Sequence, residues 1–135
     1  MSIDKAILLV DDEAIIIFAL RQELRAEIGP NYRYEIALSA AEGLEVIDEL
    51  SAEGVRVILV VSDWLMPGMR GDEFLTKVRE MHPEVKTIMV SGQIDEDQLK
   101  KLNSSGVLDL FMSKPWNSSR LAKECRRLLA EISAT

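Results

Sequence analysis

Residues 55–71 read VRVILVVSDWLMPGMRG, and this stretch decides the fold. Its first seven residues, 55–61, form an almost unbroken apolar run, which is typical of a strand buried on both faces of a parallel sheet. The run ends abruptly at Ser62 and Asp63, and a turn containing Pro67 and two glycines follows. The sequence therefore predicts a buried strand that places a carboxylate at its tip, in front of a rigid loop.

Apolar runs of strand length alternate with helical patterns along the whole chain. The runs predict five strands, at residues 6–10, 34–38, 55–61, 86–90 and 109–113. Apolar residues at spacings of three and four predict five helices, the first ending near Gly29 and the others at about 39–51, 71–81, 95–103 and from 117 onward. This order predicts an α/β fold, in which residues 1–135 form a single doubly wound domain with a five-stranded parallel sheet flanked by five helices.

The two N-terminal helices carry signals of unequal clarity. Apolar residues at helical spacing support the first helix, but the isoleucine run at residues 15–17 favours a strand if read alone. Ser39 is a good N-cap for the second helix, because Glu42 follows three residues later.

Composition excludes several classes of protein. The 135 residues suffice for one domain that buries roughly two-thirds of its unfolded surface. The single cysteine, Cys125, cannot form an internal disulfide and falls in a helical pattern, so we expect it to pack in the core of a protein in a reducing compartment. The net charge of −7 and the pI of about 4.8 argue against a nucleic-acid partner. No apolar run approaches the length of a membrane span, so we expect a cytoplasmic protein.

Polar or charged side chains of chemical interest follow four of the five predicted strands. They are, in chain order, Asp11, Asp12, Asp63, Ser91 and Lys114. Read singly, Asp12 could be a helix N-cap, Asp63 and Ser91 could be turn residues, and Lys114 could be solvated. The carboxyl ends of parallel strands meet at the edge where ligands bind in such sheets, and the joint occurrence of these residues therefore favours one site.

Electrostatics indicates a cation at such a site. Two carboxylates about 5 Å apart repel by roughly 3 kcal/mol at an effective dielectric constant near 20, so three of them together need compensation. A protonated acid is one solution, and a divalent ion beside the Lys114 ammonium is another. Because the ligands are oxygens without histidine or cysteine, the sequence favours a hard cation such as Mg²⁺.

Four segments carry these residues: LLVDDE (8–13), SDWLMPGMRGDEFL (62–75), MVSG (89–92) and FMSKPW (111–116). In this order, and over essentially the whole chain, they resemble the receiver domain of response regulators in two-component signal transduction. The resemblance implies a flavodoxin-like sheet with strand order 2-1-3-4-5. It also implies a phosphorylation-dependent switch rather than a multiple-turnover enzyme.

The resemblance assigns a role to each acidic residue. Asp63 would accept a phosphoryl group from a phosphohistidine and become an aspartyl phosphate. Asp12 would bind Mg²⁺ directly and Asp11 chiefly through water, while Asp63 itself and the backbone carbonyl of Leu65 would complete the protein ligands.

The resemblance also implies how the switch works. Ser91 and Lys114 would bind phosphoryl oxygens, and Phe111 stands where the family places its switch aromatic, although ordinary core packing of Phe111 is an equally open interpretation. The Lys114–Pro115 bond is typically cis in the family. The signal would alter the surface of the fourth helix, fifth strand and fifth helix, which would face an output domain, a downstream effector or a second copy in a homodimer.

The phosphoryl donor is expected to be a partner protein. His82, the one histidine, ends the third predicted helix and lies away from the strand tips, so the donor would be a sensor histidine kinase or a phosphotransfer protein. Leu65 and Gly92 offer no polar side chain to orient a water molecule, which favours slow self-dephosphorylation. Trp116 is similar to a residue in receivers joined to outputs such as HD-type phosphodiesterases, or it packs under the last helix.

Three alternatives remain open at this point. A pseudo-receiver would use the same fold as an unphosphorylated interaction module, although all acidic and acceptor positions are present here. A Mg²⁺-dependent phosphatase of the haloacid dehalogenase type would need a DxDx[TV] motif after the first strand, where this chain has DDEA (11–14), and a cap domain that does not fit in this length. Flavin binding is disfavoured because no Ser/Thr/Gly-rich phosphate loop follows the first strand.

Overall fold

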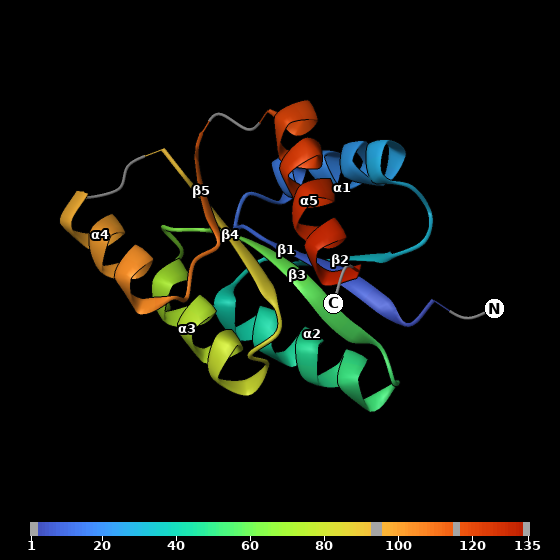
Figure 1. The fold of residues 1–135 in the computed structure, drawn as a ribbon, viewed down its shortest axis with the longest axis horizontal. Helices are drawn as coiled ribbons and strands as arrows, with labels where there is room; N and C mark the ends of the chain where they lie inside the picture. Colours follow the sequence, from blue (N-terminus) through green and yellow to red (C-terminus); the bar gives the residue numbers. More distant parts are fainter. Residues whose placement is uncertain (1–2, 93–95, 115–116, 134–135) are drawn as a thin grey trace.

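Strands and helices alternate along the chain (Figure 1). The structure, a computed structural model, describes residues 3–92, 96–114 and 117–133. Its strands are β1 (Lys5–Val10), β2 (Arg33–Ala37), β3 (Arg56–Asp63), β4 (Lys86–Ser91) and β5 (Leu110–Ser113). Its helices are α1 (Ala14–Ile28), α2 (Ala40–Ala52), α3 (Gly71–Met81), α4 (Glu96–Ser105) and α5 (Ser118–Ser133). The predicted elements are confirmed, with boundaries that shift by one or two residues.

The five strands form one parallel sheet in the order β2-β1-β3-β4-β5, as predicted. Its register places Val10 beside Ser62 and Asp63 beside Val90, so the carboxyl ends of β1, β3 and β4 reach one edge. β3 extends two residues beyond the predicted strand and includes Asp63. The carboxylate therefore belongs to the sheet rather than to the loop.

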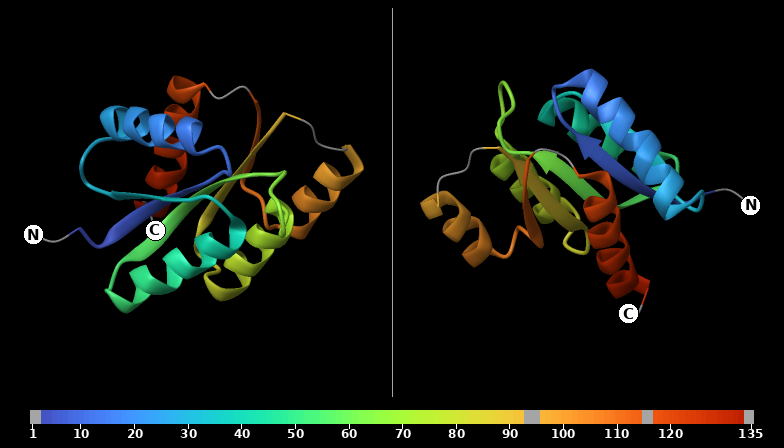
Figure 2. Two further views of the ribbon diagram at one scale, coloured as in Figure 1. Left: turned by 180° about the vertical axis from the view of Figure 1, so that it is seen from behind. Right: turned by 90° about the horizontal axis from the view of Figure 1, so that it is seen from above.

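Helices cover both faces of the sheet (Figure 2). α1 and α5 pack on one face and α2, α3 and α4 on the other, each over its own apolar cluster. β1 and β3 are buried along nearly their whole length between these layers, which explains their unbroken apolar sequences. Cys125 is fully buried in the layer of α5, as predicted, and burial raises the pKa of its thiol to about 12.

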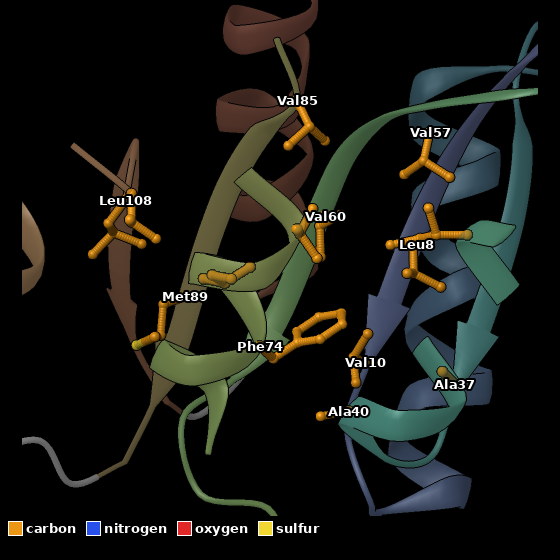
Figure 3. Packing of buried hydrophobic residues seen from close by; sticks show 14 of the residues in the cluster. Leu8, Val10, Ala37, Ala40, Val57, Val60, Phe74, Val85, Met89 and Leu108 are labelled. Atoms are coloured by element: carbon orange, nitrogen blue, oxygen red, sulfur yellow. The ribbon is translucent and has the colours of Figure 1, made fainter. Parts of the chain in front are cut away.

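Phe74 anchors α3 to the sheet and to α2. Its ring is fully buried, and Figure 3 shows it between α3 and the side chains of Val10 and Val60. Gly43 of α2 leaves room for this ring, because a Cβ at Gly43 would lie only 2.9 Å from Cζ of Phe74. This packing holds the beginning of α3 against the end of β3.

α1 is helical despite its isoleucine run. Ile17, Leu20 and Leu24 are buried against the sheet and α5, and this tertiary packing outweighs the local strand preference. Ile15 is 87% exposed and Ile16 is 39% exposed, so the outer side of the first turn is apolar. None of the helices in the described part of the chain is long and apolar enough to cross a membrane.

The N-caps of α1 and α2 differ. Glu13 occupies the N-cap position of α1 and makes no side-chain cap hydrogen bond, so Asp12 is not the N-cap. The amide of Glu42 donates to the hydroxyl of Ser39 at 3.1 Å, which confirms the predicted cap of α2. The interpretation of Asp12 as a helix N-cap is therefore wrong.

Candidate functional site

Backbone hydrogen bonds at the strand ends position the predicted site residues. The amide of Asp11 donates to the last carbonyl of β2 at 3.2 Å, and the amide that follows Asp63 donates to a carbonyl of β4 at 3.2 Å. The amide of Lys114 donates to the carbonyl of Ser91 at 2.9 Å. Hydrogen bonds to a neighbouring strand therefore hold the backbone at Asp11, directly after Asp63, and at Lys114.

Three carboxylates converge at this edge of the sheet. Asp11, Asp12 and Asp63 each place a carboxylate oxygen within 4.8 Å of the other two. Asp11 is 0% exposed and Asp63 is 5% exposed, whereas Asp12 is exposed to solvent. The cluster therefore has a buried floor and an open mouth.

Lys114 reaches into this cluster from the end of β5. Its Nζ lies 3.2 Å from Oδ2 of Asp11 and 3.2 Å from Oδ2 of Asp63. It also lies 3.5 Å from Oε1 of Glu13, whose amide donates to Oδ1 of Asp11 at 3.0 Å. Its side chain is only 19% exposed, so the interpretation of Lys114 as a solvated lysine is wrong. Glu13 was not among the predicted site residues, although the run of three acidic residues at 11–13 pointed to it.

Burial and neighbouring charges shift the pKa values in the cluster. Burial raises the pKa of Asp63, with Lys114 opposing the shift and Asp11 adding to it. Burial, a hydrogen bond with Asp11 and the charge of Asp11 raise the pKa of Asp12. Burial alone would lower the pKa of Lys114, but Asp63 and Asp11 together raise it. One ammonium group therefore does not neutralise the acidic cluster.

The donor set fits a hard divalent cation. Beside three carboxylates, the single ammonium of Lys114 leaves two negative charges uncompensated. A divalent cation would neutralise them, and carboxylate oxygens are the ligands that Mg²⁺ prefers in proteins. The acidic cluster is therefore consistent with a Mg²⁺ site.

The loop between β3 and α3 approaches Asp63 very closely. The amide of Gly71 donates to the carbonyl of Trp64 at 2.9 Å, and a Cβ at Gly71 would lie 2.2 Å from the backbone oxygen of Asp63. Gly68 has φ +88°, a left-handed conformation that glycine adopts without strain. The guanidinium of Arg70 lies 5.4 Å from the centre of the Trp64 ring and covers it. Glycines thus let this loop fold tightly behind the carboxylate.

Ser91 and Phe111 project from the same face of the sheet on neighbouring strands. Ser91 is 3% exposed at the end of β4, and Phe111 of β5 stands beside Met89, two residues earlier on β4. Phe111 is partly buried and packs against the apolar cluster beneath α2, α3 and α4. The aromatic ring is therefore packed against the core but is not fully buried.

The remaining predicted residues lie away from the cluster or outside the described residues. His82 caps the C-terminal end of α3, at the edge from which β4 starts, so it is remote from the strand tips as predicted. Leu65 follows Asp63 by two residues and is 54% exposed. Pro115 and Trp116 lie outside the described residues, so the cis bond and the role of Trp116 stay predictions.

Comparisons with known proteins identify the family of this chain. The family model of the response regulator receiver domain matches residues 7–126. The hydrogenase transcriptional regulatory protein HoxA of Cupriavidus necator is 37% identical over 122 residues, which are 90% of this chain and 23% of that protein. The sensor kinase CckA of Brucella abortus is 33% identical over 123 residues, which are 91% of this chain and 12% of that protein. The chain thus spans less than a quarter of these two relatives.

Solved structures give the same result for the fold. The crystal structure of a CheY-like response regulator receiver domain protein from Methanospirillum hungatei superposes with a TM-score of 0.80 at 32% identity, covering 96% of each chain. The parallel sheet and the acidic edge define the class: a doubly wound domain with a carboxylate cluster at the ends of its strands. The chain belongs to the response regulator receiver domain family of two-component systems.

Substituting Gly71 tests the close packing behind Asp63. We expect Gly71→Ala to lower the free energy of unfolding by about 1 to 3 kcal/mol, because the new methyl group meets backbone atoms that cannot move freely. Chemical denaturation measures this loss. Gly92→Ala is the matched control, since the nearest atom to its Cβ would be Cβ of Lys114 at 3.8 Å. Equal stability of the two variants would contradict the steric argument.

Substituting Asp63 tests the charge imbalance. Because burial raises the pKa of Asp63 above 3.8, its protonation favours the folded state. The contribution of Asp63 to the free energy of unfolding is complete below pH 3.8, and it is lost as the pH rises through the raised pKa of this carboxyl group. At neutral pH without divalent ions, Asp63→Asn should therefore raise the free energy of unfolding by about 1 kcal/mol, the size of one like-charge contact partly offset by Lys114.

Thermal unfolding in EDTA measures this gain, and exposed Asp48→Asn is the control for losing a carboxylate elsewhere. The gain should disappear toward pH 3.8. A variant that is less stable than the native protein at neutral pH would contradict the imbalance.

Proposed function

We propose that residues 1–135 act as one phosphorylation-dependent switch, which accepts a phosphoryl group from a phosphohistidine onto Asp63 in a Mg²⁺-dependent reaction. The observation that carries this proposal is the setting of Asp63, which ends a buried strand 3.2 Å from Nζ of Lys114 and within 4.8 Å of two other carboxylates. Membership of the receiver family supports it, because the family consists of signalling switches rather than ordinary enzymes.

Positioning and charge neutralisation are the main requirements of phosphoryl transfer. An oxygen of Asp63 attacks the phosphorus of the phosphohistidine, the new O–P bond forms as the P–N bond breaks, and the imidazole nitrogen leaves with the bonding electrons. Lys114, already beside Asp63, pairs with a phosphoryl oxygen. Asp11, Asp12, Asp63 and the carbonyl of Leu65 would hold Mg²⁺, which supplies further positive charge to the phosphoryl oxygens.

The phosphoryl group would shift the domain between two conformations. Moving a two-state equilibrium from about 1:99 to 99:1 takes roughly 5.5 kcal/mol. Two or three hydrogen bonds to a charged group, at about 1.5 to 3 kcal/mol each, are of this size. The Ser91 hydroxyl, Lys114 and a loop amide supply them. Movement of Ser91 toward the phosphoryl group gives Phe111 space to rotate inward, which changes the surface of α4, β5 and α5.

The domain would work between two partners in the cytoplasm. A sensor histidine kinase or phosphotransfer protein supplies the phosphoryl group, and an output domain, effector or second copy reads the surface of α4, β5 and α5. Leu65 and Gly92 bring no polar side chain to the site, so self-dephosphorylation is slow and the signal persists.

Exposed apolar side chains near Asp63 form a suitable docking surface for the phosphoryl donor. Ile15, Ile16 and Phe18 of α1 are 87%, 39% and 44% exposed, and Leu65 in the loop after β3 is 54% exposed. α1 begins two residues after the acidic Asp12, so a donor that covers the site also covers this apolar turn. Burying these side chains would stabilise the complex while the imidazole reaches Asp63.

Intact mass spectrometry tests the acceptor assignment. Incubation with Mg²⁺ and acetyl phosphate should add about 80 Da, the mass of one phosphoryl group, to the native protein and none to Asp63→Asn. EDTA should abolish the gain, because the acidic cluster then stays uncompensated. A full gain in Asp63→Asn would refute the assignment, and a gain unaffected by EDTA would refute the Mg²⁺ requirement.

A substitution in α1 tests the docking surface. Ile15→Ser should slow phosphoryl transfer from the purified histidine kinase that phosphorylates the native chain fastest, by about tenfold, because roughly 1.4 kcal/mol of apolar burial is lost. Its rate with acetyl phosphate should not change. Ile3→Ser is the control, since Ile3 is 39% exposed at the opposite edge of the sheet. Equal slowing by both variants would contradict the docking surface.

A further inference from the structure

We propose that Arg79, Thr87 and Asp109 form a polar clamp that fixes the C-terminal end of α4, so that α4 pivots about this end when the acidic site is occupied. The inference rests on the proposed switch function and deepens it. It makes these three side chains positioning residues, which act through the backbone of residues 106–109 and do not touch the acidic cluster.

Arg79 joins the last turn of α3 to the segment between α4 and β5. Its Nη1 donates to the carbonyl of Gly106 at 2.9 Å, and its Nη2 lies 2.7 Å from Oδ2 of Asp109. The Arg79 and Asp109 side chains are only 22% and 24% exposed, so this ion pair is partly shielded from water. A planar guanidinium with two separate acceptors holds the segment in one orientation.

Thr87 joins the same segment to the start of β4. Thr87 is fully buried, its amide donates to Oδ2 of Asp109 at 2.8 Å, and its hydroxyl donates to the carbonyl of Val107. The amide of Asp109 donates to the carbonyl of Thr87 at 3.1 Å. Residues 106–109 are therefore bonded to both α3 and β4, through side chains as well as backbone.

α4 itself is little buried along its length. Of its residues 96–105, Leu102 is the buried one and Leu99 is partly buried against the apolar cluster. An open groove of about 500 Å³ separates it from α3, with Thr76 and Lys77 on one wall and Lys101 on the other. Figure 1 shows α4 at one end of the molecule, beyond the body of the other helices. A helix with little packing along its length and a firm attachment at one end is suited to tilt as a unit.

The end of α4 is sharply defined at the clamp. Gly106 has φ +75°, the left-handed conformation that terminates helices, and the hydroxyl of Ser105 donates to the carbonyl of Leu102 at 2.7 Å. The clamp contacts begin at Gly106 itself. The hinge is therefore confined to the junction between α4 and the clamped segment.

The clamp and the acidic site lie at opposite ends of β4. Thr87 is near its start and Ser91 is its last residue, roughly 13 Å apart at the rise of a strand. α4 has 10 residues and is about 15 Å long, so its first turn lies near the level of Ser91 and its last turn lies at the clamp. A displacement that starts at Ser91 therefore moves the N-terminal end of α4 and leaves the clamped end in place.

Hydrogen exchange measured by mass spectrometry tests the pivot, with and without beryllofluoride and Mg²⁺ as a phosphoryl mimic. In the native protein we expect the mimic to change exchange in residues 96–102 and to leave residues 106–110 within about twofold. In Asp109→Ala, the mimic should also change exchange in residues 106–110, by about fivefold or more, because the fixed end is released. Arg79→Lys, which keeps the charge, should show a smaller effect of the same kind.

Arg33→Ala is the matched control. Arg33 forms ion pairs with Glu35 on β2 and with Glu53 after α2, and their lengths are similar to that of the Arg79–Asp109 pair. If Asp109→Ala does not fold, Arg79→Lys carries the test alone. In Asp109→Ala, exchange in residues 106–110 that rises equally with and without the mimic would overturn the pivot. A response of Asp109→Ala to the mimic identical to that of Arg33→Ala would overturn it as well. A native protein with no response to the mimic and no phosphorylation would instead overturn the switch function, and the pivot with it.

Discussion

Convergence of like charges at one edge of the sheet is the constraint on which this domain depends. Asp11 and Asp63 are buried there, and Lys114 lies 3.2 Å from an oxygen of each. A single ammonium group does not compensate three carboxylates and the nearby Glu13. The site therefore retains an affinity for positive charge, which is consistent with a Mg²⁺ site.

The rest of the fold supplies the rigidity that keeps these charges together. Continuous apolar sequences bury β1 and β3 on both faces, so their tips cannot relax away from one another. Gly43 admits the ring of Phe74, and Gly71 admits the backbone of Asp63, so α2 and α3 pack closely behind the site. This close packing thus requires small residues at both contacts.

Rigidity is not uniform across the domain. β4 is buried from Thr87 to Ser91 and links the clamped segment to the acidic site. α4 begins near one end of this strand and ends near the other, and among its residues 96–105 only Leu102 is buried. A firm strand beside a loosely packed helix is an arrangement in which a local change in charge can produce a movement of one surface element.

The sequence by itself determined the fold class, the order of the elements and most members of the site, because apolar periodicity and strand-end positions are local signals. It placed Asp11, Asp63 and Lys114 at strand tips, and the structure brings them together. Local signals were ambiguous for the isoleucine run of α1, where packing of Ile17 decides for a helix.

Only the tertiary structure decided which charges touch. It showed that Glu13 shares the ammonium of Lys114, that Gly71 must lack a side chain, and that Arg79 pairs with Asp109 across 30 positions. Such contacts join residues far apart in the chain, and their distances depend on how the helices pack on the sheet. No periodicity or motif encodes that packing, because it arises from the shapes of side chains that meet only after the chain has folded.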